Sequence, residues 1–232
     1  MTKIIRTVLE KAVQVIVSIF FYIPIVLGIL APMLTLIGID LYISWSLIGS
    51  TFIDWTWGYY IIPSSSLTFI LLIELLIFCF GLGIFLVGLI TLVKGKVKKV
   101  TIVQTGIYKY IRHPQNLGII FIFLPFALYI PGFHDKGIRM GEIVSWIFFT
   151  FVICLYSYYD EWKLMKKYNQ KYLEYYEITG LFVPKLRYNK NKSLMEINFY
   201  KKILITSILF LVFFIIFYIT VRLNLDLLMF YK

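Results

Sequence analysis

The chain has 232 residues, of which 60% are hydrophobic and 15% are charged, with a net charge of +11 and a mean hydropathy of +0.85. Soluble domains are closer to half apolar and a quarter charged, so this composition excludes an ordinary water-soluble globule and indicates an integral membrane protein. The positive charges lie in short loops beside apolar runs, which favours membrane lipids over nucleic acid as partners.

About 20 apolar residues are enough to cross a bilayer as a helix. Five such runs occur, and the predicted spans cover residues 12–39, 67–93, 117–130, 142–159 and 203–223. Pro24 and Pro32 are expected to bend or break the first span, and the third is short and contains Pro125. The predicted fold class is therefore an all-α, polytopic membrane helical bundle of about five transmembrane helices, forming one domain over residues 1–232.

The two cysteines, Cys79 and Cys154, both lie inside apolar runs. Neither has a His or Cys neighbour at the spacing of metal ligands. We therefore predict no metal site and no disulfide framework.

The distribution of basic residues predicts an orientation. Nineteen of the 23 Lys and Arg residues lie before the first span, in residues 94–116 and in residues 160–202, and the other four lie in the remaining loops and the C-terminal tail. The positive-inside rule places the basic segments in the cytoplasm. We therefore expect a cytoplasmic N-terminus and a C-terminus on the outside.

The fourth span continues into a polar segment without a break in the pattern. No proline or glycine occurs from Ile143 to Ile178, which predicts one helix about 54 Å long, against a hydrocarbon core of roughly 30 Å. The helix is expected to protrude into the cytoplasm as a helical extension. One face of it would carry residues at i+4 spacing, namely Tyr156, Asp160, Leu164, Tyr168 and Tyr172.

The stretch "TGIYKYIRHPQNLG", residues 105–118, comes immediately before the third span. Pro114 suits the first turn of a helix, and the free N–H groups of that turn can hold an anion, helped by Arg112 and His113. Asp160 and Glu161 supply the opposite charge on the same predicted side. Headgroup anchoring would explain the basic residues, and solvation the acidic pair, but the combination favours a site for a zwitterionic ligand.

Two segments resemble one known family. "GIYKYIRHPQNLG" is similar to the G-x-Y-x-x-x-R-H-P-x-Y-x-G motif of isoprenylcysteine carboxyl methyltransferases and related phospholipid N-methyltransferases. "DEWKLMKKYNQKYLEY", residues 160–175, resembles the family's E-E-x-x-L-x-x-x-F-G-x-x-Y-x-x-Y segment. Gly81-Leu82-Gly83 also stands where the phospholipid enzymes carry G-x-G. The resemblance covers about Gly81 to Pro184, and its catalytic segments would be residues 94–118 and 156–185.

The resemblance implies an integral membrane enzyme that uses S-adenosylmethionine to methylate a lipophilic acceptor taken from the bilayer. The acceptor would be a carboxylate or an amine. By the family pattern, the cofactor-binding residues would be Val100, Thr101, Ile102, Val103, Tyr108, Arg112, His113, Pro114, Gln115, Asn116, Asp160 and Glu161. Glu161 or a tyrosine would assist an amine acceptor that must lose a proton, and Tyr156 would face the polar end of the acceptor.

Four positions depart from the family pattern: Asn116 replaces Tyr, Asp160 replaces Glu, Asn169 replaces Gly, and Tyr156 stands where the prenylcysteine enzymes place an Arg. Two alternatives to a methyltransferase remain open. One is an NADPH-dependent membrane oxidoreductase like the sterol reductases, whose motif is related. The other is a non-catalytic membrane protein.

Overall fold

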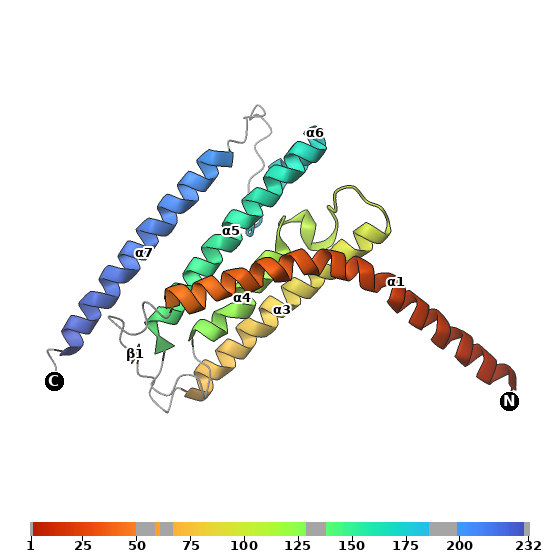
Figure 1. Ribbon diagram of the computed structural model, residues 1–232, viewed down its shortest axis with the longest axis horizontal. Coiled ribbons are helices and arrows are strands. Elements are labelled where there is room, and N and C mark those ends of the chain that lie inside the picture. Colours follow the sequence, from red (N-terminus) through yellow and green to blue (C-terminus); the bar gives the residue numbers. More distant parts are fainter. Residues whose placement is uncertain (1, 50–58, 61–66, 129–137, 186–198, 230–232) are drawn as a thin grey trace.

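The computed structural model describes residues 2–49, 59–60, 67–128, 138–185 and 199–229. This part of the chain is almost wholly helical (Figure 1). Its helices are α1 (Thr2–Leu41), the π-helix η1 (Tyr42–Gly49), α3 (Leu67–Val97), the 3₁₀ turn η3 (Gly106–Lys109), α4 (Pro114–Leu128), α5 (Met140–Tyr168), α6 (Gln170–Ile178) and α7 (Phe199–Met229). Two short strands, β1 (Tyr59–Tyr60) and β2 (Ile138–Arg139), pair antiparallel.

Within the described residues, four helices are long and apolar enough to span a membrane: Tyr22–Ser46, Thr68–Val97, Gly141–Tyr168 and Phe199–Phe217. Each overlaps a span predicted from the sequence. The third predicted span, residues 117–130, corresponds to α4, an apolar helix of 15 residues. At 1.5 Å per residue α4 is about 22 Å long, which is less than the thickness of the hydrocarbon core.

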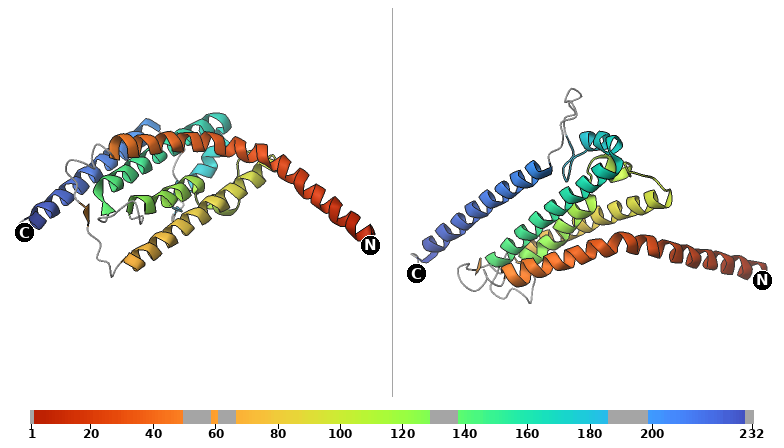
Figure 2. Two further views of the ribbon diagram at one scale, coloured as in Figure 1. Left: turned by 60° about the horizontal axis from the view of Figure 1, so that its bottom comes forward. Right: turned by 45° about the horizontal axis from the view of Figure 1, so that its top comes forward.

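Helix α1 is not broken by its two prolines. It runs without interruption from Thr2 to Leu41 with Pro24 and Pro32 inside it, and it bends so that its N-terminal part points away from the other helices (Figure 2). The part beside the bundle buries one face at helical spacing, comprising Ile29, Met33, Ile37, Asp40 and Ser44. The short apolar patch after the first predicted span continues this helix as η1.

The prediction of one continuous helix from Ile143 to Ile178 is wrong. The chain leaves helical geometry at Asn169, whose φ is +46°, and α6 starts at the next residue. A positive φ is reached most easily by glycine and, among other residues, by asparagine.

Glycines on α3 allow α4 to approach closely. A Cβ on Gly81 would lie 2.8 Å from the Gly118 carbonyl oxygen, and a Cβ on Gly118 would lie 2.7 Å from the Gly81 carbonyl oxygen. Gly88 faces Pro114 and Gly95 faces Val103 in the same way. This stripe at seven-residue spacing sets the start of α4 and residues 100–103 directly against α3, as small residues do between membrane helices.

We expect Gly118→Ala to destabilise the fold, because the added Cβ would overlap the α3 backbone. Overpacking of this kind costs about 1–3 kcal/mol. Gly83→Ala is the matched control, since a Cβ there meets nothing within 4 Å. Thermal unfolding of the two purified variants measures the difference, and equal midpoints would contradict the close packing of α3 on α4.

Helix α7 lies on the flank of the bundle beside α5 (Figure 1). Phe210 of α7 stacks on Phe151 of α5 with ring centroids 4.4 Å apart. Most α7 side chains described are exposed apolar residues, such as Leu204, Leu209 and Ile216. An apolar surface of this extent suits a lipid environment.

Candidate functional site

Two segments that are distant in sequence pair through their backbones. The Arg112 amide donates to the Gly180 carbonyl at 2.9 Å, and the Gly180 amide donates to the Tyr110 carbonyl at 3.1 Å. The hydroxyl of Tyr175 also donates to the Tyr108 carbonyl at 2.7 Å. The residues before α4 are therefore fastened to α6 and the turn that follows it, which brings the two family-like motifs together.

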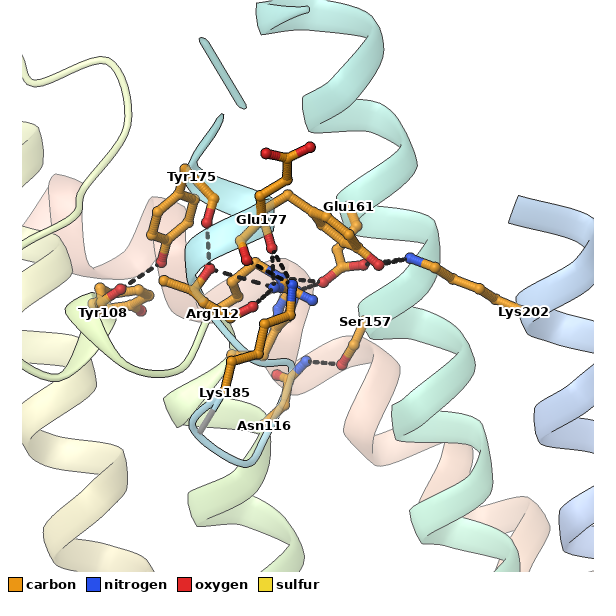
Figure 3. A network of polar contacts seen from close by, with 12 residues as sticks. Tyr108, Arg112, Asn116, Ser157, Glu161, Tyr175, Glu177, Lys185 and Lys202 are labelled. Atoms are coloured by element: carbon orange, nitrogen blue, oxygen red, sulfur yellow. Dashed lines mark hydrogen bonds and ion pairs between the residues drawn. The ribbon is translucent and has the colours of Figure 1, made fainter. Parts of the chain in front are cut away.

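Arg112 lies at the centre of this junction (Figure 3). Its Nε is 2.5 Å from Oε1 of Glu161, and the pair is almost fully buried. Its guanidinium also donates to the carbonyls of Tyr176 and Thr179 and packs 4.0 Å from the centre of the Tyr176 ring. Three elements, the start of α4, α5 and the end of α6, are thus held by one side chain.

Glu161 faces basic side chains on two sides. Besides Arg112, the Nζ of Lys202 in the first turn of α7 lies 3.6 Å from Oε2, and Nε2 of His113 lies 3.6 Å from Oε1. Lys202 also donates to the Tyr176 hydroxyl. Glu161 therefore connects α7 to the junction of α4, α5 and α6 (Figure 3).

A cavity of about 600 Å³ opens beside this junction. Its volume is in the range of roughly 300–1,000 Å³ that is typical of small-molecule sites. It is bounded by α1, the end of α3, residues 100–103, the start of α4, and α5 with α6. Eleven of the predicted site residues line it, namely Val100, Thr101, Ile102, Val103, Tyr108, Arg112, His113, Gln115, Asn116, Tyr156 and Asp160. Leu164, Tyr168 and Tyr172, which were expected on the same helix face as Tyr156 and Asp160, line it as well.

Two of the predicted site residues do not line the cavity. Pro114 is buried at the first position of α4, where it packs against Gly88. Glu161 is 1% exposed and faces Arg112 and Lys202 instead. Asp160 and Glu161 are neighbours in sequence, and successive helix residues point about 100° apart. Only Asp160 of the pair therefore reaches the cavity.

The tyrosines of this region are neutral groups. Burial raises the pKa of Tyr108, Tyr172 and Tyr175 above the ordinary value of a phenol, and it raises the pKa of Tyr176 to about 12. These hydroxyls therefore stay protonated at neutral pH, so they can donate hydrogen bonds but cannot remove a proton from a substrate.

Several polar atoms around the cavity are left for a ligand. Among the described residues, Nε2 of Gln115 is buried without a hydrogen-bond partner, and Nε2 of His113 is buried at 3.6 Å from Oε1 of Glu161. Buried polar groups without partners are uncommon in folded proteins. The first intrahelical bond of α4 runs from the Leu117 amide to the His113 carbonyl, so the N–H groups of the first turn are also open to an anion.

Asp160 supplies the opposite charge. Its carboxylate is partly buried, and the described part of the chain offers it neither a hydrogen bond nor an ion pair. The cavity thus has a donor-rich corner at the start of α4 and an acidic corner on α5. This distribution matches a ligand that carries both an anionic and a cationic group.

A smaller, apolar pocket of about 180 Å³ adjoins this cavity and is called the side pocket below. Met33, Asn116 and Tyr156 line both spaces and separate them. Asn116 is held in place because its Nδ2 donates to the Ser157 hydroxyl at 2.8 Å (Figure 3). The remaining lining comes from α1, η1 and α5, and it includes one acidic residue, Asp40.

The sequence motifs did not indicate the contributions of α1, the end of α3 and α7. Ile29 and Met33 of α1, Lys96 and Lys99 at the end of α3, and Lys202 of α7 all lie outside the two motifs. The acidic Asp40 at the end of an apolar run could have indicated a functional position on α1, because acidic residues are costly in membrane helices and rarely occur there without a function.

Comparisons with known proteins identify no relative. No family model, no curated protein and no solved structure matches the chain significantly.

Proposed function

We propose that this protein is a membrane methyltransferase that uses S-adenosylmethionine and acts on a lipophilic acceptor. The observation that carries the proposal is the cavity itself, because eleven predicted site residues from two separate segments, 100–116 and 156–160, line one space with a donor-rich and an acidic corner. The alternative of a non-catalytic protein does not account for a charged, partly unsatisfied cavity of this size. When bound, the cofactor would supply an activated methyl group.

The residues present fit the cofactor. Residues 100–103 and Tyr108 offer an apolar and aromatic surface for the nucleoside. The carboxylate of the methionine part would lie at the start of α4, with His113 and Gln115. Its ammonium would lie at Asp160. Arg112 and Glu161 would not bind the charges of the cofactor, since their own charges already face one another. They would act as positioning residues that hold the start of α4 against α5 and α6.

The acceptor would reach the site from the bilayer. Carrying an apolar chain through water costs about 0.8 kcal/mol per exposed CH₂, whereas the side pocket is apolar and its outer residues Leu36 and Ile39 are exposed on the membrane-facing part of α1. The acceptor's polar end would then arrive at Asn116 and Tyr156. Alignment of acceptor and donor there, with water excluded, would provide most of the rate enhancement.

The topology follows from the charge distribution. We propose five membrane segments, with α4 as a short third segment, a cytoplasmic N-terminus and cavity, α6 as part of a cytoplasmic extension, and an outside C-terminus. The cavity mouth would then face the compartment that supplies the soluble cofactor, while lipid would surround the exposed apolar faces of α1, α3 and α7.

Direct ligand binding tests the proposal. The full-length protein, purified in a nonionic detergent, should bind S-adenosylmethionine saturably in calorimetry, and S-adenosylhomocysteine should compete. The same titration with NADPH tests the reductase alternative, which Lys96 and Lys99 at the cavity favour because they would suit phosphate groups. Saturable NADPH binding without S-adenosylmethionine binding would overturn the proposal.

Tyr156 should govern the acceptor rather than the cofactor, because it stands between the cavity and the side pocket. We expect Tyr156→Ala to change acceptor turnover by tenfold or more and to leave the Kd of S-adenosylmethionine within about threefold. Tyr159→Phe is the control, since Tyr159 is exposed and stacks on Trp162 away from both spaces. Loss of cofactor binding with an unchanged acceptor KM would contradict this division.

A further inference from the structure

The side pocket contains one acidic residue in an otherwise apolar part of the membrane bundle. Asp40 is 4% exposed and lies on the buried face of α1. The Ser44 hydroxyl donates to its Oδ1 at 3.2 Å. Its Oδ2 is buried and has no hydrogen-bond partner among the residues that the structure describes. A carboxylate placed in a membrane segment normally marks a function, and an unpaired oxygen on it calls for a partner.

The other lining residues cannot provide that partner. The side pocket is otherwise lined by aliphatic and aromatic side chains, together with Asn116 and Tyr156 at the inner end. No cationic side chain is among the described lining residues, and the Asn116 amide already donates to Ser157. Among the described residues no donor for Asp40 Oδ2 is found, so a molecule that enters the pocket is a candidate for that donor.

The size of the pocket limits what enters. A volume of about 180 Å³ corresponds to roughly six water molecules at about 30 Å³ each, which accommodates a small polar group and the first carbons of a chain but no complete lipid. The chain would leave past Leu36 and Ile39, which are exposed on the membrane side of α1. The polar group would remain between Asp40 and the Asn116–Tyr156 boundary.

We propose that Asp40 is the residue that selects the acceptor, and that it does so by binding an amine at the end of a lipophilic chain. This inference rests on the proposed function and deepens it by naming the chemical class of the acceptor. An ammonium or amine donates to the free Oδ2 and complements its charge. A carboxylate acceptor would instead meet a like charge where little water screens the repulsion.

Binding of two matched probes tests the inference without the cofactor. Dodecylamine and dodecanoic acid have chains of equal length and opposite headgroup charge. We would measure their binding to the full-length protein in phosphatidylcholine nanodiscs, comparing the wild type with Asp40→Asn so that partition into the lipid cancels. We expect the wild type to bind dodecylamine at least tenfold more tightly than Asp40→Asn does, whereas dodecanoic acid binds Asp40→Asn equally or better.

Glu174→Gln is the matched control, because it removes one carboxylate from the exposed surface of α6. It should bind dodecylamine like the wild type. Equal amine binding by the wild type and Asp40→Asn, or a wild-type preference for dodecanoic acid, would overturn the role of Asp40. If Asp40→Asn does not fold, a diazirine analogue of dodecylamine should label the wild type within residues 33–43 or 148–156, and labelling elsewhere alone would overturn it.

The cofactor titration separates this inference from the proposed function. Asp40→Asn should keep the Kd of S-adenosylmethionine within about threefold of the wild type, because Asp40 does not line the larger cavity. If the wild type fails to bind S-adenosylmethionine, the methyltransferase proposal fails while the amine site is still measured. If the cofactor binds and the amine does not, the acceptor class alone is wrong.

Discussion

Glu161→Ala is expected to lower the free energy of unfolding by about 3–5 kcal/mol, because it leaves the buried guanidinium of Arg112 without its counter-charge. The pair is 4% and 1% exposed, so water cannot replace the lost carboxylate without opening the junction. Lys202 would lose its only acidic contact among the described residues. Thermal unfolding of the purified protein, followed by tryptophan fluorescence, measures the effect.

Glu174→Ala is the control for this prediction, because Glu174 belongs to the same motif, residues 160–175, but lies on α6 and is exposed to solvent. It should unfold within about 0.5 kcal/mol of the wild type. Lys202→Met should fall between the two, since Lys202 lies farther from Glu161 than Arg112 does. If Glu161→Ala unfolds like the wild type, Glu161 is not the anchor of the junction.

The sequence was sufficient to predict the membrane class and the positions of the helices. Apolar runs of this length allow only helices in lipid, because backbone polar groups must be satisfied within the segment. The predicted spans therefore coincide with α1, α3, α5 and α7. The sequence left open whether Pro24 and Pro32 bend or break the first span, and α1 runs through both prolines as one bent helix.

The helix break at Asn169 was missed for a local reason. A stretch without proline and glycine, such as Ile143 to Ile178, predicts an unbroken helix. Asparagine can also adopt a positive φ, so it can end a helix within such a stretch. The break matters for the site because it turns α6 and brings Tyr172 and Tyr175 over the cavity, where Tyr175 can reach the Tyr108 carbonyl.

The different roles of the two neighbouring carboxylates, Asp160 and Glu161, can be assigned only from the three-dimensional structure. A motif assigns both Asp160 and Glu161 to one ligand, yet the helix directs them to different sides, and the partner of Glu161 on α7 lies 41 residues later. Asp40 was missed because the first span was ended at residue 39, just before it. Its place on the buried face, seven residues after Met33, brings it about 10 Å along α1 from the larger cavity.

Asp160→Ala is expected to raise the Kd of S-adenosylmethionine by roughly 10- to 150-fold, since a charge-assisted hydrogen bond is worth about 1.5–3 kcal/mol. The thermal unfolding midpoint should stay near that of the wild type, because within the described chain no ion pair or hydrogen bond of Asp160 is lost. This pattern is the reverse of that expected for Glu161→Ala, although the two residues are adjacent.

Asp160→Glu provides the conservative control for the same position. It keeps the charge, and glutamate is the residue that the family pattern carries there, so cofactor binding should remain within about threefold of the wild type. Asp160→Asn keeps the shape but removes the charge, and it should behave like Asp160→Ala if the ammonium of the cofactor is the partner. Calorimetric titration of all three folded variants decides the matter. Unchanged affinity in Asp160→Ala would show that the cationic group of the ligand lies elsewhere in the cavity. The acidic corner would then no longer support the assignment of S-adenosylmethionine to this cavity.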